Sequence, residues 1–128
     1  MNTDFAQEMH DKLQKAIKHY GLSGVHPAAT IVPMMIMEEY QDLVRDVEEK
    51  GLTQDILITE EKLLLDGRNR LCALMDLGEE AEFEVYTPND PIGLVLSLNT
   101  RRNLTQSQRA MMALKVEELY AEEAKARK

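Results

Sequence analysis

The sequence predicts a single α/β (α+β) domain in which a small mixed sheet is surrounded by helices. Two short apolar runs, Ile56–Thr59 and Lys62–Leu65, flank Glu60-Glu61, which indicates a tight antiparallel hairpin. A third segment, Glu82–Tyr86, alternates polar and apolar residues as a half-buried strand does. Most of the remaining chain repeats its apolar residues at helical spacing, and 44% hydrophobic residues in 128 suffice for one core.

The segments before the hairpin predict two helices and an irregular connection. The first apolar stripe begins at Phe5 and predicts an amphipathic helix that ends near Gly21. We expect this helix to pack on its own domain, although its stripe also suits a partner surface. Prolines bracket the next segment, Val25–Pro33, and predict extended or irregular backbone. A second stripe, Tyr40–Val47, predicts a helix that Gly51 caps.

Three further helices are predicted after the hairpin. The first begins at the turn Asp66–Arg70, where an apolar run stops and restarts at helical spacing. Asp90-Pro91 places a capping residue before a proline, so a helix begins there and carries Asn99 on its apolar face. Thr105–Gln108 is a capping box that starts the last helix. The apolar face of that helix consists of Met112, Val116, Leu119 and Tyr120.

These elements divide the chain into an N-terminal amphipathic helix (residues 1–22), a main domain (residues 23–115) and the end of the last helix (residues 116–128). The lone cysteine, Cys72, lies in an apolar helical pattern, so we expect a core residue and no internal disulfide. The three histidines share no metal-ligand spacing, and we expect no metal site of protein ligands alone. No apolar run approaches the roughly 18 residues that span a bilayer. We therefore expect no membrane partner and a cytoplasmic location.

The turn Asp66–Arg70 has the composition of a phosphate site. It combines a glycine, an amide and two guanidiniums with the free N–H groups of a helix start. Arg101 and Arg102 end a second predicted helix, where two adjacent arginines exceed what the helix dipole needs. Between Leu63 and Leu114 every basic side chain is Arg, although the chain has eight Lys elsewhere. Because Arg binds phosphate oxygens through a bidentate fork, this segregation favours an anion site.

Several of these polar residues have two interpretations. Asp66 either caps the following helix, or holds Mg²⁺ against a triphosphate or accepts a proton from an attacking hydroxyl. Arg68 and Arg70 cannot both face one direction from a helix start. One of them therefore contacts phosphate while the other pairs with an acid such as Asp66 or Glu79. Asn99 is either a satisfied buried amide or a pocket contact.

The formal net charge of −8 restricts the partners of this chain. A domain that binds duplex DNA by itself normally carries a net positive charge or a continuous basic stripe. We therefore expect DNA to be engaged only indirectly, through a C-terminal domain outside this sequence or a partner, or through the local arginine cluster.

Three segments resemble, in order and spacing, the three boxes of the ParB/sulfiredoxin-like N-terminal domain. They are Gly51–Ile58, Leu65–Ala73 and Asn99–Leu104, and the resemblance covers roughly residues 25–115. In ParB partition proteins these boxes form a pocket for cytidine triphosphate (CTP). The first box lines the pocket, the second wraps the phosphates, and the third supplies an Asn and an Arg near phosphate and magnesium.

The resemblance implies that the chain binds a nucleoside triphosphate, CTP or ATP, together with Mg²⁺. It makes Asp66 and Asn99 candidates for the metal, which would be held through the phosphates, and Asp66 a candidate catalytic residue. The candidate ligand contacts are Gln54, Gly67, Arg68, Asn69, Arg70, Asn99 and Arg102, with Arg101 beside them.

Differences from the family pattern narrow the activity. The turn Asp66–Arg70 is closer to the Asp-Gly-x-x-Arg form of phage and plasmid ParB-like proteins and of free-serine kinases than to the Gly-Glu-Arg-Arg of partition proteins. Leu98 replaces the family's Glu that is linked to metal and hydrolysis, which disfavours nucleotide hydrolysis. Sulfiredoxin activity is excluded, because Arg68 and Asn69 stand where that enzyme has Cys and His.

Three hypotheses for the function follow. The first is a ParB-like nucleotide-binding module, for which the sequence leaves open whether it forms a homodimer. It would act as a switch or assembly domain in DNA partition, or in phage or plasmid maintenance or regulation. The second is an ATP-using small-molecule kinase or NTPase with Asp66 as base or metal ligand. The third is a pure protein-interaction domain, whose surface is the N-terminal helix and the segment Met34–Met37.

Overall fold

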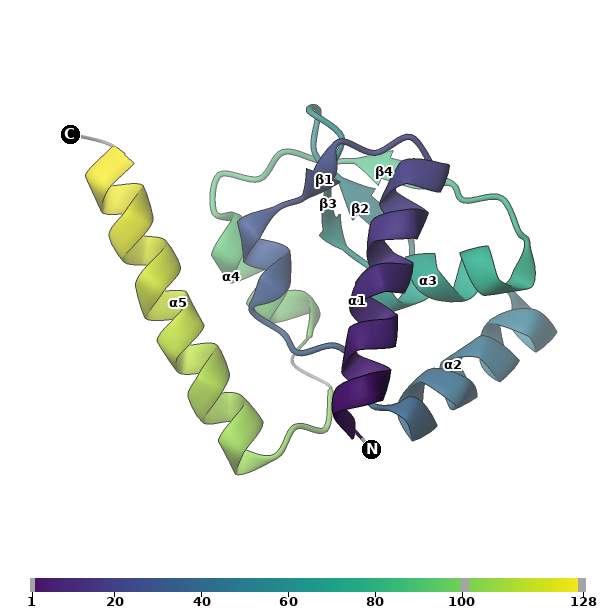
Figure 1. The fold of residues 1–128 in the computed structure, drawn as a ribbon. Coiled ribbons are helices and arrows are strands. Elements are labelled where there is room, and N and C mark those ends of the chain that lie inside the picture. The colour runs from purple at the N-terminus through teal and green to yellow at the C-terminus, as the bar shows by residue number, and fades with distance from the viewer. Residues whose placement is uncertain (1, 100–101, 127–128) are drawn as a thin grey trace.

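The computed structural model describes residues 2–99 and 102–126, and within these ranges the chain forms a small sheet with helices around it (Figure 1). The strands are β1 (Gly24–Val25), β2 (Ile56–Ile58), β3 (Leu63–Asp66) and β4 (Phe83–Val85). The α-helices are α1 (Asn2–His19), α2 (Met37–Lys50), α3 (Arg68–Leu77), α4 (Pro91–Leu98) and α5 (Gln106–Ala126). A short 3-10 helix, η1 (Pro27–Thr30), follows β1. The predicted fold class is confirmed.

The sheet is mixed and has the strand order β1-β3-β2-β4. β2 and β3 form the predicted antiparallel hairpin, whose turn places Lys62 at a positive φ of 65°. β4 lies parallel to β2 with Ile56 opposite Phe83, and β1 lies parallel to β3. β1 was not predicted, because two residues before a proline-rich segment are too few to show an alternating pattern.

The strand β3 is buried on both faces of the sheet. Leu64 and Leu65 are both 0% exposed, and because successive strand residues point to opposite faces they enter two different clusters. Leu64 joins a core formed with α1, α2 and α3, whereas Leu65 joins a second core under η1 and α4. Burying such a side chain contributes about 1.5–3 kcal/mol. The end of β3, where the polar turn begins, is therefore firmly fixed.

Most sequence expectations for the helices hold. The stripe of α1 is buried against its own domain, with Met9 1% exposed, and Cys72 is a buried core residue as predicted. The apolar face predicted for α5 is only partly correct. Leu119 is buried, but Tyr120 is 42% exposed, because α5 lies at the edge of the domain (Figure 1).

The methionine segment before α2 divides between core and surface. Met34 and Met35 pack partly against the first core, whereas Met37 is 47% exposed. No helix among the described residues is both long enough and apolar enough to cross a membrane.

Candidate functional site

The turn between β3 and α3 is built around Gly67. This residue precedes the first helical residue of α3 with a φ of 111°, a conformation that other residues rarely adopt. A Cβ at this position would lie 3.1 Å from Cγ1 of Ile56 and 3.2 Å from Nη2 of Arg70. The conformation and the tight packing of the turn at this position therefore favour glycine.

Asp66 does not cap α3, so the first interpretation of this residue is wrong. It ends β3 in register with Leu57, and Gly67 takes the capping position. Its Oδ2 instead accepts a hydrogen bond of 2.7 Å from Nη2 of Arg70, and the two side chains are 16% and 15% exposed. Nη1 of Arg70 donates to Oε1 of Gln54 at 2.7 Å. Arg70 is thus the arginine that pairs with a local acid.

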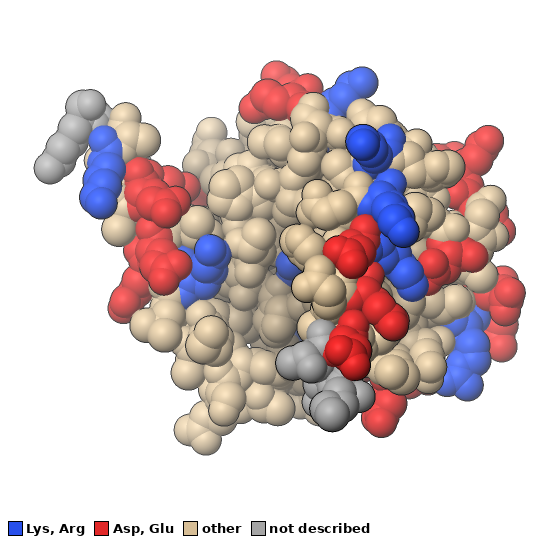
Figure 2. Space-filling model, in the orientation of Figure 1, with Lys and Arg blue, Asp and Glu red and all other residues tan. Residues whose placement is uncertain are grey.

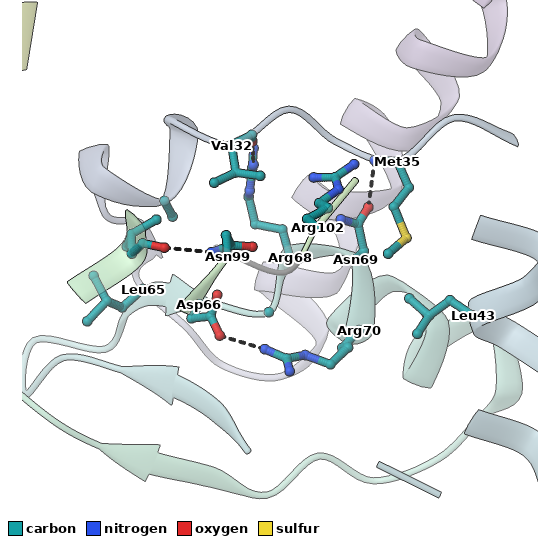
Figure 3. Close-up of a pocket in the computed structure, with 13 residues that line it drawn as sticks. Val32, Met35, Leu43, Leu65, Asp66, Arg68, Asn69, Arg70, Asn99 and Arg102 are labelled. Atoms are coloured by element: carbon teal, nitrogen blue, oxygen red, sulfur yellow. Dashed lines mark hydrogen bonds and ion pairs between the residues drawn. The ribbon is translucent and has the colours of Figure 1, made fainter. Parts of the chain in front are cut away.

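Arg68 and Asn69 point away from that pair, toward the segment between η1 and α2 (Figure 3). Arg68 donates from Nη2 to the carbonyl of Val32, and Oδ1 of Asn69 accepts from the N–H of Met35 at 3.2 Å. Burial, and then the positive charge of Arg102, lower the pKa of Arg68 to about 10. Two cations therefore share this part of the pocket.

The end of α4 and the residues after it supply the other side of the pocket. Asn99 follows the last helical residue of α4, and its Nδ2 donates to the carbonyl of Val95 at 2.8 Å. The side chain of Arg102 is 13% exposed and donates from Nη1 to the carbonyl of Pro33. Its Nη2 lies 3.6 Å from Oε1 of Glu39. Nε and Nη2 of Arg102 are buried without a hydrogen-bond partner among the described residues.

Together these side chains line one cavity of about 160 Å³ with a polar and an apolar part (Figure 3). The polar lining residues are Asp66, Gly67, Arg68, Asn69, Arg70, Asn99 and Arg102. The apolar lining residues are Ala29, Val32, Met35, Leu43, Leu65 and Val95. The second and third boxes of the sequence therefore meet at one place.

Not every candidate residue lines this cavity. Gln54 reaches it only through its hydrogen bond to Arg70, and Arg101 lies outside the described residues. Three further residues, Val32, Pro33 and Glu39, contact the arginines of the pocket and were not predicted from the sequence. One sequence signal could have indicated these contacts. The prolines predict irregular backbone, and irregular backbone has carbonyls that are free to accept hydrogen bonds.

The described residues contain no group of three or more His, Cys, Asp or Glu side chains that could hold a metal ion. Asp66 and Asn99 nevertheless both line the cavity. Each keeps one side-chain oxygen that no hydrogen bond within the described part of the chain uses. Such a pair suits a metal that takes most of its ligands from a bound phosphate and water.

Comparisons with known proteins show the fold. No protein-family model and no curated protein sequence matches the chain. Among solved structures, a crystal form of a Pnob8-like ParB-N domain superposes with a TM-score of 0.63 and 19% sequence identity. The chain has the fold of a ParB N-terminal domain. The match covers 83% of this chain and 44% of the other, so it spans less than half of the length of that chain.

Proposed function

We propose that this ParB-like domain binds a nucleoside triphosphate, CTP or ATP, with Mg²⁺ between the Gly67 turn and the end of α4. We further propose that the bound nucleotide makes the domain a switch or assembly module in DNA partition, or in phage or plasmid maintenance or regulation. One observation carries the binding proposal: Arg102 is buried in the cavity, and two of its nitrogen atoms lack hydrogen-bond partners within residues 2–99 and 102–126.

The charges in the cavity favour a polyanion. Asp66 forms an ion pair with Arg70. In the part of the chain that the structure describes, Arg68 and Arg102 donate hydrogen bonds to backbone carbonyls, and the ion pair of Arg102 is with the partly exposed Glu39. Burying an N–H donor without an acceptor costs about 1–3 kcal/mol, and a charged donor costs more. Two neighbouring buried guanidiniums add mutual repulsion. Phosphate oxygens would remove both costs, since each oxygen accepts hydrogen bonds and carries negative charge.

The backbone adds a second set of donors. The first N–H groups of α3, at residues 68–70, have no partner within the helix, and they lie at the positive end of its dipole. Gly67 lets a phosphate approach this backbone, because no Cβ stands in the way. A triphosphate can therefore contact the α3 N-terminus and Arg102 at once.

Magnesium fits the same position. A bare carboxylate beside phosphates would repel them, and Mg²⁺ is commonly held by one or two protein carboxylates together with phosphate oxygens. Asp66 supplies one such oxygen, and Asn99 supplies a neutral one. When bound, the ion would neutralise part of the phosphate charge.

The kinase or NTPase alternative has no observation in its favour. It requires Asp66 as a base or as a metal ligand. A role as base is disfavoured because this carboxylate already accepts a hydrogen bond from Arg70, and a role as metal ligand is shared with the binding proposal. Leu98, at the position of the family's hydrolytic Glu, is 43% exposed and has no oxygen or nitrogen in its side chain. The interaction-domain alternative loses part of its surface, because the stripe of α1 is buried in the domain.

Calorimetric titration with CTP, ATP, GTP and UTP, each with and without Mg²⁺, tests the proposal. We expect CTP or ATP to bind, and to bind more tightly with Mg²⁺. The corresponding monophosphate should bind much more weakly, because it leaves Arg102 or the α3 N-terminus without a phosphate. A phosphate-release assay on the same samples tests the alternative enzyme function. If no nucleotide binds to a folded sample, the interaction-domain hypothesis replaces this one.

A further inference from the structure

The segment Val32–Ile36, which we call the strap, crosses the pocket between η1 and α2. Three side chains of the pocket hold it: Arg68 through the carbonyl of Val32, Arg102 through that of Pro33, and Asn69 through the N–H of Met35. These three side chains belong to the group that we propose for phosphate binding. The strap and a phosphate therefore compete for the guanidinium donors of Arg68 and Arg102, whereas Oδ1 of Asn69 accepts from the strap and cannot bind a phosphate oxygen.

Few other polar contacts hold the middle of the strap. Within the described residues, no backbone–backbone hydrogen bond ties residues 32–35 to the sheet or to a helix. The ends are anchored differently. The side chain of Val32 is buried in the second core, and the N–H of Ile36 donates to Oε1 of Glu39 at 3.1 Å, at the start of α2. The stretch Pro33–Met35 can thus move between two fixed ends, provided that Met34 and Met35 give up their partial packing against the first core.

The size of the cavity favours such a movement. Its volume is about 160 Å³, whereas sites for small molecules usually measure roughly 300–1,000 Å³. With the strap in place, a nucleoside triphosphate would have to extend out of the cavity. The charges favour the same movement: the Pro33 carbonyl lies on Nη1 of Arg102 and Glu39 lies near Nη2, so a phosphate on either nitrogen competes with one of them.

We propose, on the basis of the proposed nucleotide binding, that the strap closes the site and that nucleotide binding opens it. Phosphate oxygens replace the Pro33 carbonyl and the Glu39 carboxylate on Arg102, and residues 33–35 move away from the cavity. Glu39 links this movement to α2, since the same carboxylate oxygen caps the helix and lies near Arg102. Ile36, already 50% exposed, and its neighbour Met37 would change their surroundings as the strap opens.

Hydrogen exchange of the full chain with CTP·Mg²⁺ or ATP·Mg²⁺ tests the movement directly. We expect the amides of Met34 and Met35 to exchange faster when nucleotide is bound, while those of residues 68–70 exchange more slowly. Nucleotide binding with slower or unchanged exchange at Met34 and Met35 would overturn the strap proposal and leave the proposed function standing.

A pair of matched variants tests the competition. Glu39→Gln removes the charge near Arg102 but keeps an oxygen that caps α2, whereas Glu38→Gln makes the same charge change in the same helical turn at an exposed position. We expect Glu39→Gln to bind the nucleotide about two- to fivefold more tightly, as for the loss of a weak ion pair. Glu38→Gln should have a smaller effect.

An equal gain in both variants would show a general charge effect and overturn the role of Glu39. Absence of binding to the wild type, Glu39→Gln and Glu38→Gln would overturn the proposed function, and the strap proposal with it.

Discussion

Replacing Arg102 by alanine tests whether this arginine binds the ligand or stabilises the fold. The guanidinium of Arg102 is buried, yet it makes one hydrogen bond, to the carbonyl of Pro33, and one longer ion pair, to Glu39. Nε and Nη2, the nitrogen of that ion pair, are buried without a hydrogen-bond partner among the described residues. Arg109, exposed on α5 and outside the cavity, offers a matched control that removes the same charge.

The structure predicts that Arg102→Ala has a large effect on nucleotide binding and a small effect on stability. Losing a charge-assisted hydrogen bond to phosphate should weaken nucleotide binding by about 1.5–3 kcal/mol, or roughly 10- to 150-fold. The folded variant loses a hydrogen bond of similar strength, the one to the carbonyl of Pro33. It also escapes the cost of the unpartnered donors, about 1–3 kcal/mol, and the repulsion from Arg68. The free energy of unfolding should therefore change by less than about 1 kcal/mol.

Calorimetric titration with CTP·Mg²⁺ or ATP·Mg²⁺ and urea unfolding of the same samples measure the two quantities. Arg102→Ala should lose affinity at nearly constant stability, and Arg109→Ala should change neither. Unchanged affinity in a folded Arg102→Ala variant would remove this residue from the site. A loss of several kcal/mol in stability would instead make Arg102 a structural residue, and the reasoning from its unpartnered donors would fail.

Three other outcomes are expected. Gly67→Ala forces a φ of 111° on a residue whose Cβ meets Ile56. The free energy of unfolding in urea should therefore fall by about 1–3 kcal/mol, and an unchanged value would contradict the role of the turn. Burial lowers the pKa of His26, whose Nδ1 accepts from the N–H of Ala28, so wild-type stability should fall as the pH drops below about 6.5. His26→Asn keeps an acceptor that does not titrate, and unfolding at pH 7.5 and 5 should show a smaller loss. Fluorescence anisotropy at about 0.15 M salt should give no submicromolar affinity for duplex DNA, because the net charge is −8 and acidic and basic side chains are interspersed on the face shown in Figure 2.

The elements of the fold could be predicted because their signals are local. The hairpin β2–β3 follows from two apolar runs around a polar pair, and α4 begins where Asp90-Pro91 predicts it, with Asp90 accepting from the N–H of Gly93. The capping box of α5 is present in both directions, between Thr105 and Gln108. Each of these features depends on residues fewer than ten positions apart.

The contacts that define the pocket could not be predicted in the same way. The hydrogen bonds from Arg68 and Arg102 to the strap join residues 36 and 69 positions apart, and their acceptors are backbone carbonyls, which every residue has. The capping role considered for Asp66 is wrong for a related reason. The register of β3 keeps Asp66 in the sheet opposite Leu57, and sequence alone does not fix the residue at which a strand ends.

The distribution of charge supports the proposal that the strap and the nucleotide exclude one another. With the strap closed, Glu39 offsets part of the charge of Arg102, while Asp66 balances Arg70. If the strap opens and Arg102 leaves Glu39, the three arginines and one aspartate among the described lining residues leave a net charge of about two positive in the cavity. A nucleoside triphosphate with one bound Mg²⁺ carries about two negative charges, so it matches the open cavity. The closed cavity, in which Glu39 offsets part of this charge, matches a less charged anion. In this proposal, the position of Glu39 therefore determines whether the charge of the cavity matches a triphosphate.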